Sequence, residues 1–225
     1  MGGTLDLFMG DLLYSLEKIN DKLSLVINGS RFKPLTIDFI EGKARHRREY
    51  GGGRGQLIAK AIGIKKRDHL SVLDLTAGLG HDAFVLACLG CHVTMVERSL
   101  IVAALLEDAL RRLKEDSELL PLSLQLIQQD AFDYLQQLHS QPDVIYLDPM
   151  YPDSKNTAQP KKEMQILREL LGHDQDAAKL MPLALAKAKH RVVVKRPRHG
   201  ERLIDRDPDV VYAGKSSRFD VYIGT

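Results

Sequence analysis

The sequence has little of several residue types, and each scarcity excludes a class of protein. It has no tryptophan, only two cysteines, and no apolar run near the roughly 18 to 20 residues that a membrane span needs. The N-terminus also lacks the basic-then-apolar pattern of a secretory signal, so we expect a cytoplasmic protein that does not enter the membrane. Cys88 and Cys91 form a C-x-x-C pair, but zinc needs further soft ligands at suitable spacing. We therefore interpret both cysteines as small core residues and expect no metal.

The sequence also lacks a large excess of charge of either sign. The 225 residues include 32 Lys and Arg against 30 Asp and Glu, which gives a formal net charge of +2. Attraction to a polyanion must therefore come from local clusters of charge rather than from the overall balance. The length and the 44% hydrophobic content suffice for one α/β core, with room for a small additional lobe.

The pattern of the chain changes near Arg54. Before it, residues 23–27 and 36–40 are typical of short strands, with Asn28-Gly29 as a turn signal between them. These features predict a small β-rich N-terminal lobe. We place this lobe and a basic, glycine-rich segment at residues 1–53, and a single catalytic domain at residues 54–225.

From residue 70 onward, predicted strands and helices alternate. Such alternation requires a mostly parallel sheet with helices on both faces, and we expect seven strands ending in an antiparallel hairpin, a Rossmann-like α/β fold. The helix at 99–113 has the clearest apolar stripe, and Ser99 can cap its start. The predicted strands are 72–75, 93–96, 124–127, 144–147, 191–195, 210–212 and 219–222, and the predicted helices are 81–89, 99–113, 131–138, 161–171 and 176–188.

The pattern of residues 72–83 predicts a buried strand, a turn of small residues and the start of a helix. Gly78 and Gly80 allow the backbone to approach a ligand closely. The spacing Gly78-x-Gly80-x-x-Ala83, with Glu97 further on, also fits a dinucleotide site, so spacing alone does not separate NAD from S-adenosylmethionine. Asp74, at the end of the strand, favours S-adenosylmethionine because its carboxylate suits the cationic amino-acid end of that cofactor. A tight turn without a ligand is the alternative.

Two more acids follow the next two strands. Glu97 ends its strand, and its two oxygens can accept both hydroxyls of a ribose; a solvated surface glutamate is the alternative. Asp130 reaches the same carboxyl edge of the sheet, where we expect the adenine ring. It can also cap the helix that follows, and the two roles are compatible.

The most specific pattern is Asp148-Pro149-Met150-Tyr151, which follows the fourth strand at the same sheet edge. An exocyclic base amine is a poor nucleophile because its lone pair is delocalised into the ring, so a site must orient that pair toward the methyl carbon. Asp148 can accept one N–H, and the Pro149 carbonyl can accept the other. Tyr151 can stack on an extruded base. The pattern predicts methylation of a base amine; a rigid loop with a buried tyrosine is the alternative.

Two basic clusters are candidates for contact with RNA. The first, residues 43–55, contains Arg47, Arg48 and Arg54 beside a run of glycines. The second, residues 190–199, contains Lys195 and Arg196 at the end of a predicted core strand. A solvated charged face is the alternative for each cluster.

Taken together, these motifs resemble the bacterial RsmJ family from about residue 39 to the C-terminus. The resemblance implies a class I methyltransferase that uses S-adenosylmethionine, without a metal, to methylate the N2 amine of one guanine in 16S ribosomal RNA, guanine 1516. It implies small-subunit RNA or a 30S assembly particle as the partner, and leaves the oligomeric state open. A non-catalytic RNA-binding or ribosome assembly factor and a methyltransferase acting on another base amine remain alternatives.

The resemblance also implies a set of cofactor residues: His81, Asp82, Glu97, Arg98, Asp130, Ala131 and Asp148. The strings that carry the resemblance are His46-Arg47-Arg48, Gly51-Gly52-Gly53-Arg54-Gly55, Asp74-x-Thr76-Ala77-Gly78-Leu79-Gly80-x-Asp82-Ala83-Phe84-Val85-Leu86, Glu97-Arg98, Tyr146-Leu147-Asp148-Pro149-Met150 and Val192-Val193-Val194-Lys195-Arg196-Pro197.

Overall fold

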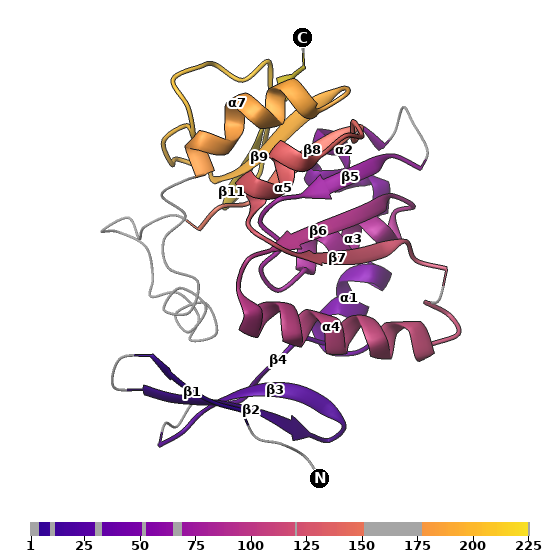
Figure 1. Ribbon diagram of the computed structural model, residues 1–225. Helices are drawn as coiled ribbons and strands as arrows, with labels where there is room; N and C mark the ends of the chain where they lie inside the picture. The colour runs from indigo at the N-terminus through magenta and orange to yellow at the C-terminus, as the bar shows by residue number, and fades with distance from the viewer. Residues whose placement is uncertain are drawn as a thin grey trace.

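The computed structural model describes residues 5–9, 12–29, 33–50, 53–64, 69–119, 121–150 and 177–224 (Figure 1). These residues form a large seven-stranded sheet and a small four-stranded sheet near the N-terminus. No helix within them is long and apolar enough to cross a membrane.

The large sheet has the strand order β10-β11-β9-β8-β5-β6-β7. Strands β5 to β9 are parallel, while β11 runs antiparallel to both β9 and β10. The predicted mostly parallel sheet with a C-terminal antiparallel hairpin is therefore confirmed. The strands are β5 (Ser71–Asp74), β6 (His92–Glu97), β7 (Leu124–Gln128), β8 (Val144–Leu147), β9 (Arg191–Pro197), β10 (Val210–Ala213) and β11 (Ser217–Ile223).

Helices cover both faces of this sheet. On one face, α2 (Leu57–Ile62), α3 (His81–Cys88) and α4 (Leu100–Glu115) pack into one hydrophobic cluster. On the other face, α5 (Ala131–Gln137) and α7 (Ala177–Lys187) pack into a second cluster. Ser99 caps α4 as expected, since its hydroxyl accepts the N–H of Val102. The helix predicted at 161–171 lies outside the described residues.

The small sheet confirms a β-rich N-terminal lobe. It is antiparallel, with β1 (Leu5–Met9), β2 (Leu12–Ile19), β3 (Lys22–Ile27) and β4 (Leu35–Thr36) in sequence order. The predicted strand at 36–40 is wrong in extent, because β4 ends at Thr36. Asp38 ends it: its Oδ1 accepts the N–H groups of Ile40 at 2.9 Å and Glu41 at 3.2 Å, which turns the chain.

The small sheet docks on α4, which Figure 1 shows lying between the two sheets. The backbone N–H of Leu23 in β3 donates to Asp108 Oδ2 at 3.1 Å, and Arg112 Nε donates to the same oxygen at 2.8 Å. Arg112, only 9% exposed, also donates to the carbonyl of Ile37. A buried arginine on α4 thus satisfies backbone and carboxylate acceptors from both parts of the chain.

The basic segment at residues 43–55 contains more helical structure than its glycines predict. Residues Gly42–Tyr50 form helix α1, and Gly53–Gly55 form a short 3₁₀ turn, η1. Helix α1 belongs to the proposed N-terminal lobe but packs against α3 of the large domain. The domain boundary after residue 53 stays a prediction.

The two cysteines lie in the core, as predicted. Cys91 is buried and Cys88 is half-buried at the end of α3. Burial raises the pKa of each thiol to about 11, so neither is a ready nucleophile at neutral pH.

Candidate active site

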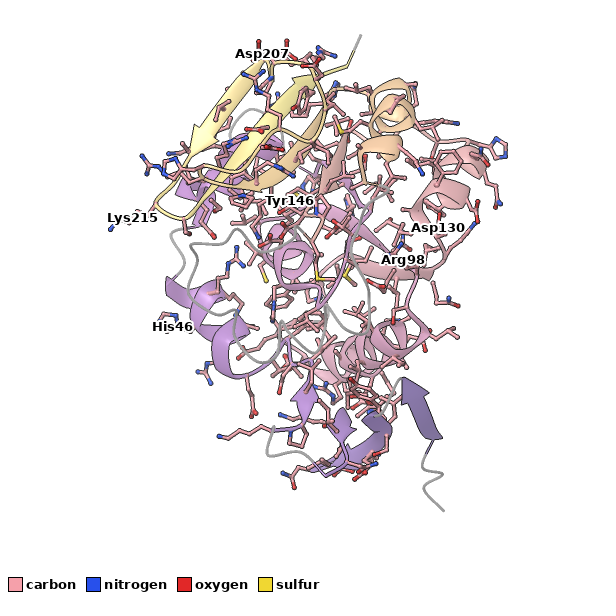
Figure 2. All side chains as sticks on the ribbon, turned by 90° about the vertical axis from the view of Figure 1, so that its left-hand side faces the viewer. His46, Arg98, Asp130, Tyr146, Asp207 and Lys215 are labelled. Carbon is pink, nitrogen blue, oxygen red and sulfur yellow. The ribbon has the colours of Figure 1, made fainter. Side chains whose placement is uncertain are left out.

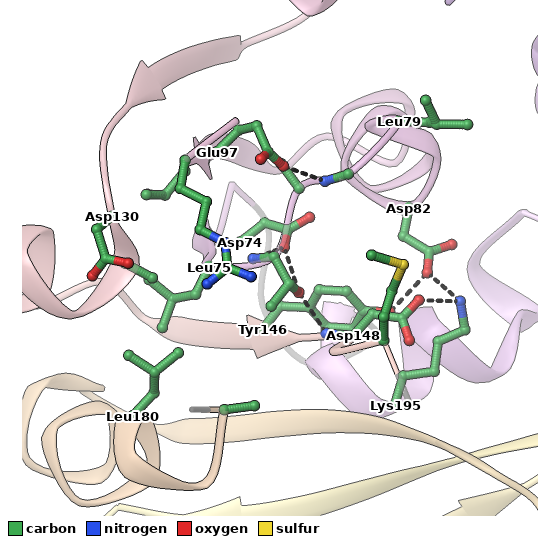
Figure 3. A pocket seen from close by; sticks show the side chains of 18 of the residues that line it. Asp74, Leu75, Leu79, Asp82, Glu97, Asp130, Tyr146, Asp148, Leu180 and Lys195 are labelled. Atoms are coloured by element: carbon green, nitrogen blue, oxygen red, sulfur yellow. Dashed lines mark hydrogen bonds and ion pairs between the residues drawn. The ribbon is translucent and has the colours of Figure 1, made fainter. Parts of the chain in front are cut away.

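The candidate site lies where the strand order of the large sheet reverses. Strands β5 and β8 are neighbours there, and the chain leaves them in opposite directions along the sheet. In open α/β sheets, ligands bind in the crevice at this point, outside the carboxyl ends of the strands. A cavity of about 550 Å³ opens at this point between the ends of the strands (Figure 3). Its lining includes Asp74 at the end of β5 and Asp148 just after β8.

The loop between β5 and α3 needs glycine at two positions for different reasons. Gly78 and Gly80 have φ angles of 51° and 69°, in the left-handed region. Gly78 lines the cavity, and a Cβ there would meet nothing closer than the Thr76 carbonyl at 3.9 Å. A Cβ at Gly80 would lie 2.9 Å from Phe39 and 3.0 Å from Leu106, inside the core. Gly78 therefore leaves the backbone open to a ligand, whereas Gly80 permits close packing.

Glu97 fixes the same loop. It is 6% exposed, and its Oε2 accepts the N–H of Gly78 at 3.0 Å while its Oε1 accepts the N–H of Ser99 at 2.8 Å. The alternative of a solvated surface glutamate is therefore wrong. Arg98, the next residue, is exposed and also lines the cavity.

Asp74 is a carboxylate buried in the cavity wall, with 2% of its surface exposed. Burial raises its pKa to about 7, the hydrogen bond from the Thr76 N–H opposes this rise, and the nearby acids Asp82 and Asp148 add to it. A cation placed against this carboxyl would be strongly favoured.

Asp130 begins α5 and lines the cavity together with Ala131. Its Oδ1 accepts the N–H groups of Phe132 at 2.8 Å and Asp133 at 3.3 Å, so the helix-capping role is confirmed. His81, the first residue of α3, is exposed and lines the cavity as well.

Asp148 lies at the centre of the site. Its N–H donates to Thr76 Oγ1 at 2.6 Å, which ties the end of β8 to the loop after β5. Its Oδ2 accepts Lys195 Nζ at 2.7 Å. Pro149 is buried, and Tyr151 lies outside the described residues, so its stacking role stays a prediction.

Asp82 gathers three donors on one carboxylate. Its Oδ1 accepts Arg47 at 2.9 Å, and its Oδ2 accepts the Tyr146 hydroxyl at 2.7 Å and Lys195 Nζ at 2.8 Å. Burial tends to raise the pKa of Asp82, but Lys195 and Arg47 hold it well below its usual range. Protein groups thus engage both oxygens of this predicted cofactor residue.

The residues predicted to bind RNA fall in three places. Arg47 and Lys195 lie in the cavity wall, bound to Asp82. Arg48 on α1 is half-buried and Arg54 in η1 is exposed. Arg196 is only 6% exposed, because it points to the opposite face of β9 from Lys195, and we leave it out of the proposed RNA surface.

Two residues that shape the site were missed by the sequence patterns. Thr76 joins the ends of β5 and β8, and Tyr146 donates its hydroxyl to Asp82 from inside the core. The sequence does contain one indication for Tyr146: it is the one residue with a polar group in the apolar strand 144–147. A buried tyrosine hydroxyl needs a hydrogen-bond partner, so a polar neighbour could have been expected.

Comparison with known proteins identifies the family. A family model for SAM-dependent methyltransferases matches residues 9–224. The ribosomal RNA small subunit methyltransferase J of Coxiella burnetii (strain RSA 331) is 57% identical over 190 residues, covering 84% of this chain and 75% of that protein. The protein of the same name from Ectopseudomonas mendocina is 47% identical over 218 residues, covering 95% of this chain and 84% of that protein. This chain belongs to the methyltransferase J family.

The family assignment settles the cofactor. Its members are SAM-dependent methyltransferases, so the cofactor is S-adenosylmethionine, and the NAD alternative left open by the glycine spacing is excluded. The crystal structure of a SAM-dependent methyltransferase from Neisseria gonorrhoeae is 41% identical, with a TM-score of 0.72 over 90% of this chain and 79% of that chain. A hypothetical protein from Thermus thermophilus, 14% identical with a TM-score of 0.52, shares the fold alone.

The cavity of this methyltransferase fits its cofactor on three observations. A volume of about 550 Å³ lies within the range of small-molecule sites. The buried carboxyl of Asp74 is a natural partner for an ammonium group, and the backbone at Gly78 presents no side chain to the cavity.

Proposed function

We propose that this protein transfers a methyl group from S-adenosylmethionine to the exocyclic N2 amine of guanine 1516 in 16S ribosomal RNA. The observation that carries the proposal is the position of Asp148, just after β8 and beside the end of β5, in the wall of the cofactor cavity. Pro149 follows it in the chain but is not among the residues that line the cavity. The names of the relatives support small-subunit ribosomal RNA as the substrate.

Residues at the ends of three neighbouring strands are assigned to the cofactor. Asp74 would hold the amino-acid end and Glu97 the ribose, while Asp130 and Ala131 would contact the adenine. The Gly78 backbone, with Gly80 packed beneath it, would let the loop close against the ligand, and His81, Asp82 and Arg98 complete this part of the wall. Bound S-adenosylmethionine supplies an electrophilic methyl group on a sulfonium.

Asp148 and Pro149 are assigned to the amine. The Asp148 carboxylate accepts one N–H and the Pro149 carbonyl accepts the other, which favours the tetrahedral nitrogen of the transition state over the planar ground state. Tyr151 would stack on the guanine. The two cysteines of the chain are absent from the cavity lining, and burial raises the pKa of both thiols to about 11. Direct transfer to nitrogen, which needs no thiol nucleophile, therefore fits this site better than covalent carbon methylation.

The basic helix α1 is the proposed RNA surface. Arg45 and His46 are exposed on it, Arg48 follows in its last turn, and Arg54 is exposed in η1. Figure 2 shows His46 on the outer side of this helix, whereas Tyr146 lies in the interior. Arg47 of the same helix reaches into the cavity, so the proposed RNA surface adjoins the methyl-transfer site.

A methyl-transfer assay tests the proposal. With tritiated S-adenosylmethionine and undermethylated small-subunit RNA, offered both naked and as 30S particles, wild-type protein should transfer label. Asp148→Asn should bind S-adenosylhomocysteine nearly as well but lose on the order of 100-fold in kcat, because the amide presents one acceptor fewer and repels an N–H. Asp133→Asn, an exposed acid on α5, is the matched control and should retain activity. Full activity of Asp148→Asn would refute the assigned amine chemistry.

A further inference from the structure

Lys195 connects the proposed catalytic carboxylate to a second, buried one. Its Nζ lies 2.7 Å from Asp148 Oδ2 and 2.8 Å from Asp82 Oδ2, and Figure 3 shows it between the two acids. The lysine comes from β9 and the acids come from the loop after β8 and the start of α3. Three separate segments therefore meet at one ammonium group.

The local charges explain why the lysine stays in place. Burial tends to lower the pKa of Lys195, but the carboxylates of Asp148 and Asp82 overcome this effect and raise the pKa above its usual value. Lys195 is therefore cationic throughout the working pH range. Because Arg47 also binds Asp82, the two acids, the lysine and the arginine together carry no net charge, and each buried carboxylate has a cationic partner.

Asp82 serves as a fixed anchor for this lysine. Only 10% of its side chain is exposed, and Arg47 and Tyr146 hold it from two other elements. On the other side, the backbone of Asp148 is held by Thr76. With its N–H and its Oδ2 both bound, the carboxylate of Asp148 has a defined rotation before any substrate arrives.

We infer that Lys195 is a positioning residue for methyl transfer: it holds the Asp148 carboxylate in the orientation that receives the substrate amine, instead of contacting RNA phosphate. The inference rests on the proposed function, because it requires Asp148 to bind the amine. A misplacement of about 1 Å in such an acceptor can cost on the order of 100-fold in rate.

The decisive variant is Lys195→Met, which keeps the length of the side chain and removes the ammonium. Its kcat for methylation of small-subunit RNA should fall on the order of 100-fold. Its KM for RNA and its affinity for S-adenosylhomocysteine should stay within about twofold, because Arg47 and Tyr146 still hold Asp82 in the cofactor wall. Lys195→Arg restores a cation and should recover part of the lost kcat. Lys114→Met, which removes an exposed lysine from the end of α4, is the control and should leave kcat unchanged.

A phosphate contact predicts the opposite pattern. In that case Lys195→Met would weaken RNA binding, reduce the slope of log K against log salt by about 1, and leave kcat at saturating RNA unchanged. Either that pattern or an unchanged kcat would overturn the inference. If wild-type protein transfers no methyl group to the RNA, the proposed function itself fails, and the two failures are thus distinguishable.

A second variant protects the test against loss of stability. Asp82→Asn keeps Lys195 but removes the charge of its anchor, and should lower kcat less than Lys195→Met does. In the double variant, kcat at saturating S-adenosylmethionine should be no lower than in Lys195→Met alone, because Asp82 acts on Asp148 through the lysine. Simple additivity of the two losses would contradict a positioning role. Melting temperatures of all variants show whether each one is folded under the assay conditions.

Discussion

Gly78 and Gly80 look equivalent in the sequence but have different tasks in the structure. Both were predicted to bind the cofactor, and both have positive φ angles, yet only Gly78 lines the cavity. A Cβ at Gly80 would instead meet Phe39, Leu106 and Met95 of the core. The spacing of the glycines predicts where a glycine is needed, but it does not indicate whether a ligand or a core side chain lies next to it.

Alanine substitution should separate the two tasks. Gly80→Ala should lower the free energy of unfolding by about 2 to 4 kcal/mol, since an overpacked core adds to the cost of a left-handed alanine. Gly78→Ala should cost about 1 kcal/mol for the backbone alone and weaken binding of S-adenosylhomocysteine. Urea unfolding and calorimetric titration measure the two effects. Equal destabilisation by both substitutions would contradict the assignment.

The buried carboxyl of Asp74 makes a pH prediction. Its pKa is about 7 in the folded protein against an ordinary value of 3.8, so between these values the folded state holds a proton that the unfolded state has released. The contribution of this group to stability is therefore present below about pH 4 and is lost as the pH rises to about 7. A cationic ligand needs the ionised form and must displace the proton.

Affinity for S-adenosylhomocysteine should accordingly rise between pH 5.5 and pH 7, with a proton released on binding. Calorimetry in buffers of different ionisation enthalpy measures both the affinity and the proton count. Asp74→Asn should bind more weakly and with little pH dependence in this range. A wild-type affinity that is constant across the range would show that Asp74 does not meet the amino group.

At the scale of elements, helix α4 joins the two sheets through Arg112. This side chain is buried and meets Asp108 of its own helix and the Ile37 carbonyl of the N-terminal segment. Arg112→Met should lower the free energy of unfolding by about 3 kcal/mol, because it leaves buried acceptors without their donor. Urea unfolding measures the loss.

Arg111→Met is the matched control for this element. Arg111 precedes Arg112 on α4 and pairs with Asp108 and Glu115 at the surface, where an ion pair contributes little. Its loss should leave the unfolding midpoint almost unchanged. If the two variants had equal effects, Arg112 would not be the link between α4 and the small sheet.

The sequence predicted best those helices and strands whose own residues show a clear apolar pattern. The strands of the parallel sheet are short apolar runs, and α4 has both a stripe and a cap, so local patterns placed them within about two residues. Strand β2 was missed because its apolar residues at 12, 13, 16 and 19 fit helical spacing as well. Helix α1 was missed because it is polar on nearly every side and is held by α3 and by the Arg47–Asp82 ion pair.

At the scale of the whole molecule, the reversal of strand order brings the ends of β5 and β8 together. The sequence could predict that Asp74, Glu97, Asp130 and Asp148 share one edge, because the carboxyl ends of parallel strands always do. It could not predict the partner of Lys195. That contact depends on which face of β9 the lysine occupies and on the distance to α3, and both follow from packing between distant segments.

The most direct test of the central claim is the identity of the methylated nucleoside. Small-subunit RNA from a strain that lacks this protein would be incubated with the protein and S-adenosylmethionine carrying a deuterated methyl group, then digested to nucleosides for mass spectrometry. We predict that the label appears in N2-methylguanosine, at one position of 16S RNA, and that Asp148→Asn abolishes most of it. Label on a ring carbon or on another base, with none on guanine N2, would contradict the proposed chemistry.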